Sequence, residues 1–307
     1  MENKTLDIDR NAKGNNDIRI TVVDAGNYNM KYMGQGEMGY FSSKVSNDEQ
    51  AYNDAYDRIE LDGRITYIGQ FGELSREYNK VDRNLLPQLL FAICKANKDK
   101  DTIITNVTTM LPILQMPYKN KLIEQLKSQN SFKIKFNGVD KTIFIKEVAV
   151  LPESFASFYD MTPEQQKEDV CIVDCGSRTV NVCTFINNGR LEKTATIKLG
   201  SLDFFKKIKS IEASKGKDYV EEDIERLIKN GKINVTDKQY KDFFNEILNS
   251  IKADVNIENY KTYFTGGTAN MFSKYIPSSC NMFTNPLYSN LNGALKASEL
   301  KWGKVNG

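Results

Sequence analysis

Two segments of the chain, 150 residues apart from Asp24 to Asp174, carry the same kinds of residue in the same order. In each, an apolar run ends at an aspartate, a glycine follows two positions later, and a second apolar stretch comes after a few polar residues. The segments span residues 20–33 and 171–185, and the shared glycines are Gly26 and Gly176. This pattern is typical of a buried strand, a tight turn and a second strand. Its repetition predicts a duplicated fold in which two such turns face each other.

Turns of this kind could bind a nucleotide together with its magnesium ion. Glycine has no Cβ, so the backbone N–H groups of a glycine turn can approach phosphate oxygens closely. A carboxylate cannot bind phosphate itself, but Asp24 and Asp174 could hold Mg²⁺ through water, and the ion would neutralise the phosphates. Two opposed turns would then clamp an Mg-nucleotide between them. The alternative is a pair of ordinary hairpins with polar turns.

We assign the turn residues of both segments to the nucleotide site. They are Gly26, Asn27, Tyr28, Asn29, Gly176, Ser177, Arg178 and Thr179. Lys31 lies four residues past Asn27 and could reach a phosphate; alternatively, it is a strand lysine that faces solvent.

A third glycine turn follows a strand-like run at residues 260–265. Gly266 and Gly267 would let a ligand approach the backbone, and Thr268 would begin a helix whose N-terminus points at that ligand. We therefore add these three residues to the nucleotide site. The alternative is a simple turn from strand to helix.

Glu153 follows Pro152 at the end of a long β-branched stretch. As a catalytic residue it would present its carboxylate from a strand end toward the cleft, near the terminal phosphate. Proline at a helix start and an acid in the first helical turn are also favourable for helix initiation, so the alternative is a helix-start acid.

Composition narrows the possible chemistry. The 307 residues contain no histidine, which excludes a Ser-His-Asp triad, a Cys-His dyad and histidine-ligated zinc. The net charge of +2 gives no strong attraction to nucleic acid or membrane, and no apolar run approaches the ~20 residues of a membrane span. The five cysteines show no paired metal spacing, and we interpret them as reduced residues of a cytoplasmic protein.

The remaining elements form an alternating α/β pattern. Hairpins are predicted at Asp62-Gly63 and Asn137-Gly138, and a central strand at 102–111. Helices are expected at 84–96, 117–129, 218–230 and 240–252, with a last helix that ends at Trp302. Residues 34–56 should be a loop with one short strand, and the polar residues 69–80 a connector. Residues 1–17 contain almost nothing to bury and should form a flexible tail.

Taken in order, these motifs resemble those of the actin-like ATPase superfamily. The matching residues are Asp24, Gly26, Asn27 and Lys31, Pro152-Glu153, Asp174, Gly176 and Ser177, Thr265 to Thr268, and Asn292-Gly293-Ala294. The hairpin within residues 132–151 that leads into Leu-Pro-Glu-Ser is most similar to bacterial plasmid-segregation actins of the ParM type. Three positions depart from the usual pattern: Tyr28 where a small residue is common, Arg178 where glycine or threonine is usual, and Asn181 where an acid is frequent.

The resemblance implies an actin-like α/β fold of two duplicated RNase H-like domains with a nucleotide cleft between them. Domain I would span 18–165, with a small insertion at about 35–80, and domain II 166–290, with a helical insertion at about 201–258. Residues 291–307 would form a C-terminal helix that returns to domain I. The resemblance also implies ATP- or GTP-driven assembly into filaments that move plasmid DNA. The partners would be further copies of the chain and a DNA-binding adaptor on the plasmid centromere, with no direct contact to nucleic acid or membrane.

Two other functions remain open at this point. One is a non-polymerising small-molecule kinase of the same superfamily, although no sugar-binding signature is present. The other is an RNase H-like nuclease in which Asp24, Glu153 and Asp174 hold two metal ions. The net charge and the phosphate turns oppose the nuclease.

Overall fold

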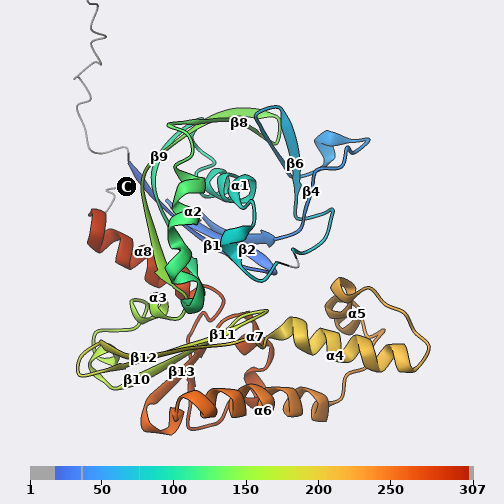
Figure 1. Cartoon of the computed structure of the whole chain (residues 1–307), viewed down its shortest axis with the longest axis vertical. Coiled ribbons are helices and arrows are strands. Elements are labelled where there is room, and N and C mark those ends of the chain that lie inside the picture. The colour runs from blue at the N-terminus through green and yellow to red at the C-terminus, as the bar shows by residue number, and fades with distance from the viewer. Residues whose placement is uncertain (1–17, 36, 76, 304–307) are drawn as a thin grey trace, which may run out of the picture.

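A computed structural model describes residues 18–35, 37–75 and 77–303, and Figure 1 shows the chain as two domains joined at one side. The tail expected at residues 1–17 and the last four residues of the expected C-terminal helix lie outside the described part. No helix in the described part is long and apolar enough to cross a membrane.

The two sheets repeat one topology. The core of the first has the order β3-β2-β1-β7-β9, and the second has the order β12-β11-β10-β13-β14. In both, the first three strands are antiparallel and the last three are parallel. The first-sheet strands are Arg19–Ala25 (β1), Asn29–Gly34 (β2), Glu37–Ser42 (β3), Thr102–Leu111 (β7) and Val139–Pro152 (β9). The second-sheet strands are Val170–Cys175 (β10), Val180–Ile186 (β11), Arg190–Ile197 (β12), Lys261–Thr265 (β13) and Asn281–Met282 (β14). The predicted duplicated α/β fold is confirmed.

The first sheet continues beyond β9 through β8-β5-β6-β4, which curve over α1 in Figure 1. These strands are Phe132–Phe136 (β8), Arg58–Leu61 (β5), Arg64–Ile68 (β6) and Val45–Ser46 (β4). The two predicted hairpin turns join β5 to β6 and β8 to β9, and Asp62-Gly63 and Asn137-Gly138 all have positive φ. That conformation is the one that a two-residue type I′ turn requires.

Helices cover the sheets. The first domain has Leu86–Ala96 (α1) and Lys119–Leu126 (α2), and the second has Ser201–Ser214 (α4), Ile224–Lys229 (α5), Asp237–Asp254 (α6) and Gly267–Met271 (α7). Phe155–Phe158 (α3) and Ser289–Trp302 (α8) pack against each other, and α8 also contacts β1, β2 and β7 of the first domain. Figure 1 places both near the junction of the domains.

Two expected elements differ in detail from the structure. Residues 34–56 hold two strands, β3 and the short β4, where we expected a loop with one short strand; the side chains of β3 are partly or fully exposed, so it lacks the apolar signal of a buried strand. The helix expected at 218–230 is shorter: a 3₁₀ turn at Glu221–Asp223 leads into α5. The three acids of that turn favour a helix start, which explains the sequence signal.

The crossing of α8 over α3 depends on Gly293, because a Cβ at that position would lie 1.8 Å from the carbonyl oxygen of Ala156. We expect Gly293→Ala to lower the free energy of unfolding by about 1–3 kcal/mol, since a close-packed interface cannot absorb the added atom. Urea titration followed by circular dichroism would measure this loss. Leu300→Ala on the same helix is the control, because that side chain is 78% exposed. Equal stability of Gly293→Ala and the control would contradict the close crossing.

Candidate functional site

The structure brings nearly all of the predicted site residues to one cleft of about 300 Å³, lined by both domains. Its lining includes Asp24, Gly26, Asn27, Tyr28, Asn29, Lys31, Glu153, Asp174, Gly176, Ser177, Thr179, Gly266, Gly267 and Thr268. Arg178 is the exception among the predicted residues and does not line this cleft. The volume lies at the lower end of the range typical of small-molecule sites.

Strand pairing places the two aspartates equivalently. Asp24 lies near the end of β1 and pairs in register with Lys31 of β2, and Asp174 near the end of β10 pairs with Asn181 of β11. Each pair spans seven residues across one turn, so the two halves of the cleft are built by the same local geometry. Gly26 permits the first turn, because a Cβ there would lie 2.2 Å from the carbonyl oxygen of Asn29.

The first half of the site is a paired charge cluster. Lys31 Nζ lies 2.9 Å from Asp24 Oδ2, and Lys80 Nζ lies 3.9 Å from Asp24 Oδ1. Burial acts to raise the pKa of Asp24, but the two ammonium groups outweigh it and leave that pKa below its usual value. Burial likewise opposes the charge of Lys31, while Asp24 and the more distant carboxylates raise the lysine's pKa. Both groups therefore remain ionised at neutral pH.

In the second half of the site, no ammonium group pairs directly with the carboxylate of Asp174 among the described residues. Asn290 of α8 donates an amide hydrogen bond of 2.8 Å to Asp174 Oδ2. Burial and the negative charge of Glu153 nevertheless raise the pKa of Asp174 to about 7, against the opposing effects of Lys31 and Asn290. Asp174 can therefore exchange a proton near neutrality, whereas Asp24 cannot.

Glu153 lies between the two halves and is 7% exposed. Its Oε1 contacts the ammonium group of Lys80, and its Oε2 accepts a 2.8 Å hydrogen bond from the amide of Asn181. The alternative of a helix-start acid is wrong in its geometry: α3 is one turn long, has no acid in that turn and has no side-chain cap. The carboxylate points into the cleft, as the catalytic hypothesis requires.

The turn at Gly266 and Gly267 lines the cleft beside Asp174. Gly266 has φ +92°, and a Cβ there would lie 2.4 Å from Cys175 O and 2.5 Å from Asp174 Oδ1, so the turn must be glycine. The hydroxyl of Thr268 donates a 2.7 Å hydrogen bond to Gly176 O and so links this turn to the turn between β10 and β11. Phe205 and Met271 add apolar surface to the same cleft.

Tyr28 connects the first turn to the second domain. Burial and a hydrogen bond to Glu225 of α5 raise its pKa, and its ring packs against the core of the second domain. This contact explains how a large residue is accommodated in a turn where a small one is usual.

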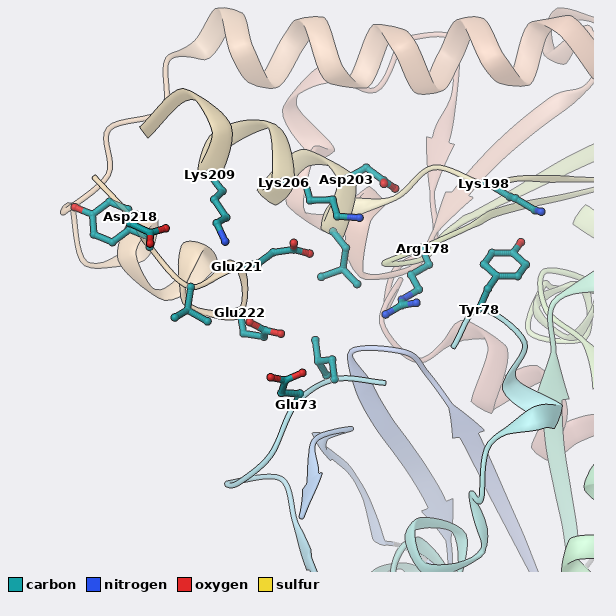
Figure 2. A pocket seen from close by; sticks show the side chains of 14 residues that line it. Glu73, Tyr78, Arg178, Lys198, Asp203, Lys206, Lys209, Asp218, Glu221 and Glu222 are labelled. Atoms are coloured by element: carbon teal, nitrogen blue, oxygen red, sulfur yellow. The ribbon is translucent and has the colours of Figure 1, made fainter. Parts of the chain in front are cut away.

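Arg178 points into a second, larger cavity of about 720 Å³, shown in Figure 2. Its guanidinium group donates to the carbonyl oxygen of Ser75, which comes from the first domain. Lysines and acids both line this cavity, so no single sign of charge dominates. The prediction that Arg178 belongs to the nucleotide cleft is not supported by this position, because a turn residue's side chain can leave the face that its backbone forms.

Sequence reasoning missed three polar residues of the site. Lys80 was assigned to a polar connector, although it is only 2% exposed and lines the cleft. Asn290 lies just before the Asn292-Gly293-Ala294 motif. The sequence marks Asn181 only as a departure from a family pattern. The strand register could have revealed Asn181, since it occupies the position of Lys31 in the other half. Nothing in the local pattern marks Lys80 or Asn290.

The donor set fits a water-coordinated magnesium ion. Among the described residues, no group of three or more histidine, cysteine or acidic side chains is arranged to hold a metal directly. Asp24 and Asp174 instead line the cleft with separate carboxylates from the two domains, and Mg²⁺ typically keeps several waters and takes few protein ligands.

Comparison with known proteins agrees with the fold. Residues 22–155 match the family of actin-like proteins by its N-terminal domain. No curated protein matches the chain. Among solved structures, the apo ParM protein of pSK41 aligns with a TM-score of 0.70 at 19% identity, covering 94% of this chain and 99% of that one.

Two further structures are similar. A 15-stranded ParM filament from Clostridium botulinum aligns with a TM-score of 0.73 at 17% identity, covering 92% of this chain and 99% of that one. The archaeal actin homologue Ta0583, in its complex with ADP, aligns with a TM-score of 0.73 at 14% identity, covering 90% and 97%. At these identities the likeness establishes the actin-like fold.

The pKa of Asp174 predicts a pH-dependent stability. The folded protein keeps this proton up to about pH 7, whereas the unfolded chain loses it near the ordinary value of 3.8. The folded state therefore binds the extra proton between these values, and the free energy of unfolding should fall as pH rises from 5 to 7, by up to about 1.4 kcal/mol per pH unit. Above pH 7 this contribution is lost.

Urea unfolding of the protein without nucleotide or magnesium would measure this slope. The range from pH 5 to 7 is favourable for this measurement because the chain has no histidine, the side chain that ordinarily titrates in that range. Asp174→Asn is the matched variant, since it cannot ionise, and its stability should change less with pH. Identical slopes for both proteins between pH 5 and 7 would contradict a raised pKa at Asp174.

Proposed function

We propose that this chain, which has the actin-like fold and an actin-like N-terminal domain at residues 22–155, is a nucleotide-dependent filament-forming protein that hydrolyses ATP or GTP. One observation carries the proposal: the two duplicated strand–turn–strand units bring Asp24 and Asp174 to one cleft, and Glu153 lines the same cleft from just past the end of β9. We further propose that its filaments drive the segregation of plasmid DNA in the cytoplasm, with a DNA-binding adaptor as partner. Similarity to ParM proteins supports this role.

The residues of the cleft have separate tasks in this proposal. The backbone N–H groups of the two phosphate turns and the ammonium of Lys31 would bind the phosphates. Asp24 and Asp174 would hold Mg²⁺ through water, and the bound ion would neutralise charge on the phosphate oxygens. Gly266 and Gly267 would let the nucleoside lie against the start of α7.

Glu153 would orient the attacking water and accept its proton. Phosphoryl transfer depends mainly on positioning and charge stabilisation, so a single well-placed carboxylate is sufficient. Both carboxylate oxygens already accept one hydrogen bond each from the protein. A carboxylate oxygen can accept more than one, which leaves capacity for water.

The alternatives receive less support. A two-metal nuclease would require cations between the carboxylates, but the ammonium groups of Lys31 and Lys80 already lie beside Asp24. No specific feature of the cleft favours a small-molecule acceptor, as a kinase would need.

Nucleotide-dependent assembly is the direct test. We expect light scattering by the purified protein to rise when ATP or GTP is added with magnesium, and to fall as the nucleotide is consumed. Electron microscopy of the same samples should show filaments. A protein that stays monomeric at micromolar concentration with every nucleotide would contradict the proposal.

Glu153→Gln should separate assembly from turnover. The variant keeps the shape of the side chain but cannot accept the proton, and loss of a general base typically costs a factor of about 10²–10⁴ in rate. Filaments should still form and should last longer, because their subunits keep the nucleotide. Phosphate release and filament lifetime would be measured on one preparation.

Glu147→Gln is the matched control, since Glu147 lies on β9, the strand that leads into Glu153, and is exposed. Its phosphate release and filament lifetime should match those of the unaltered protein. Normal phosphate release by Glu153→Gln would remove the catalytic role of Glu153.

A further inference from the structure

Lys80 is an unusual residue for the end of a polar connector, because only 2% of its surface is exposed. Its ammonium group contacts Glu153 Oε1 and lies 3.9 Å from Asp24 Oδ1. A buried ion pair contributes little stability compared with apolar residues of the same volume, since both charges lose their water. Stability alone therefore does not explain a lysine at this position, and its contact with Glu153 points to the chemistry of the cleft.

The backbone of Lys80 is fixed as firmly as its side chain. Gln115, in the 3₁₀ helix Ile113–Tyr118, accepts a 2.9 Å bond from the Lys80 N–H and donates a 3.3 Å bond to the carbonyl oxygen of Tyr78. Gln115 is itself 3% exposed. The lysine is therefore presented to Glu153 from a defined point and does not reach it by chance from a mobile surface.

Glu153 is held from both domains. Lys80 of the first domain contacts Oε1, and Asn181 of the second domain donates to Oε2. Asn181 is oriented in turn by Thr196, which donates a 2.8 Å bond to its Oδ1. The backbone N–H of Glu153 donates 2.8 Å to Leu111 O. With its backbone and both carboxylate oxygens held, the carboxyl group has one orientation in the cleft.

We propose that Lys80 is a positioning residue for nucleotide hydrolysis: together with Asn181 it fixes the Glu153 carboxylate in the orientation that activates water. This inference rests on the proposed function, in which Glu153 is the base. Lys80 acts through Glu153 and not on the nucleotide. Removing its ammonium group should therefore slow turnover while leaving nucleotide binding nearly unchanged.

A double-mutant cycle with Lys80→Met and Glu153→Gln tests this inference. In the unaltered background, we expect Lys80→Met to lower kcat about 10²-fold, the usual effect of misplacing a catalytic group by about 1 Å. The Kd for Mg-nucleotide should stay within about threefold, since Lys31 still pairs with Asp24 and Lys80 is assigned no contact to the nucleotide. In the Glu153→Gln background, Lys80→Met should have no further effect on kcat, because the group that it positions no longer acts.

Lys141→Met is the matched control for the loss of a buried lysine. Lys141 is 6% exposed and bonds to Lys98 O and Lys100 O, outside the cleft. The Lys141→Met variant should have a lower melting temperature and an unchanged kcat. If Lys80→Met does not fold, Gln115→Ala replaces it: this variant keeps the lysine, loosens its backbone, and should lower kcat about tenfold, again only when Glu153 is present.

The outcomes separate the inference from its premise. A slow Glu153→Gln variant combined with an unchanged kcat in Lys80→Met would overturn the role of Lys80 alone. Equal losses from Lys80→Met in both backgrounds, or a Kd that rises as much as kcat falls, would show that Lys80 contacts the nucleotide and would also overturn it. Normal turnover in Glu153→Gln would overturn the proposed base, and the positioning role with it.

Discussion

The structure of this protein depends on how charge is buried where its two domains meet. Five ionisable side chains share the inner end of the cleft, three carboxylates and two ammonium groups: Asp24, Glu153, Asp174, Lys31 and Lys80. An isolated buried charge is costly, so each of them needs a partner. Asp24 and Glu153 receive ammonium groups, which leaves Asp174 with only the amide of Asn290. Burial and the nearby charge of Glu153 therefore raise the pKa of Asp174, and Lys31 and the Asn290 amide offset them only in part.

Several elements that are distant in the sequence contact that cluster. Lys80 is held by Gln115, whose 3₁₀ helix follows β7, and Asn290 is supplied by α8 from the end of the chain. Asn290 also accepts hydrogen bonds from Ser154 and Ser157, so one amide links Asp174 to the segment after Glu153. The close crossing of α8 over α3 at Gly293 brings this amide within reach. The packing of the C-terminal helix against α3 therefore also places the amide that hydrogen-bonds to Asp174 in the cleft.

Much of this could be predicted from the sequence, because much of it is local. The duplicated turns, the two type I′ hairpins and the strand before Glu153 all follow from short-range patterns of apolar residues, glycine and asparagine. The contacts of Lys80 and Asn290 join residues 73 and 116 positions apart, and no local pattern encodes such a pairing. Arg178 shows a different limit: its place in the turn was predictable, but the direction of its side chain depends on Ser75 of the other domain. The single short strand expected within residues 34–56 could not be placed more closely, because the exposed edge strand β3 has no buried face to produce an apolar signal.

The duplication keeps the topology of the five core strands, but not the charge of the residue that faces each aspartate. Lys31 faces Asp24, whereas Asn181 faces Asp174. A lysine at residue 181 would neutralise Asp174, but it could not also accept the hydrogen bond from Thr196 that orients the Asn181 amide. Asparagine instead donates to Glu153 and leaves Asp174 undercompensated. Asp24 is thus ionised at neutral pH, whereas the pKa of Asp174 is raised to about 7. Two identical halves would bind the two sides of a ligand in the same way, whereas a nucleotide with its cation has two different sides.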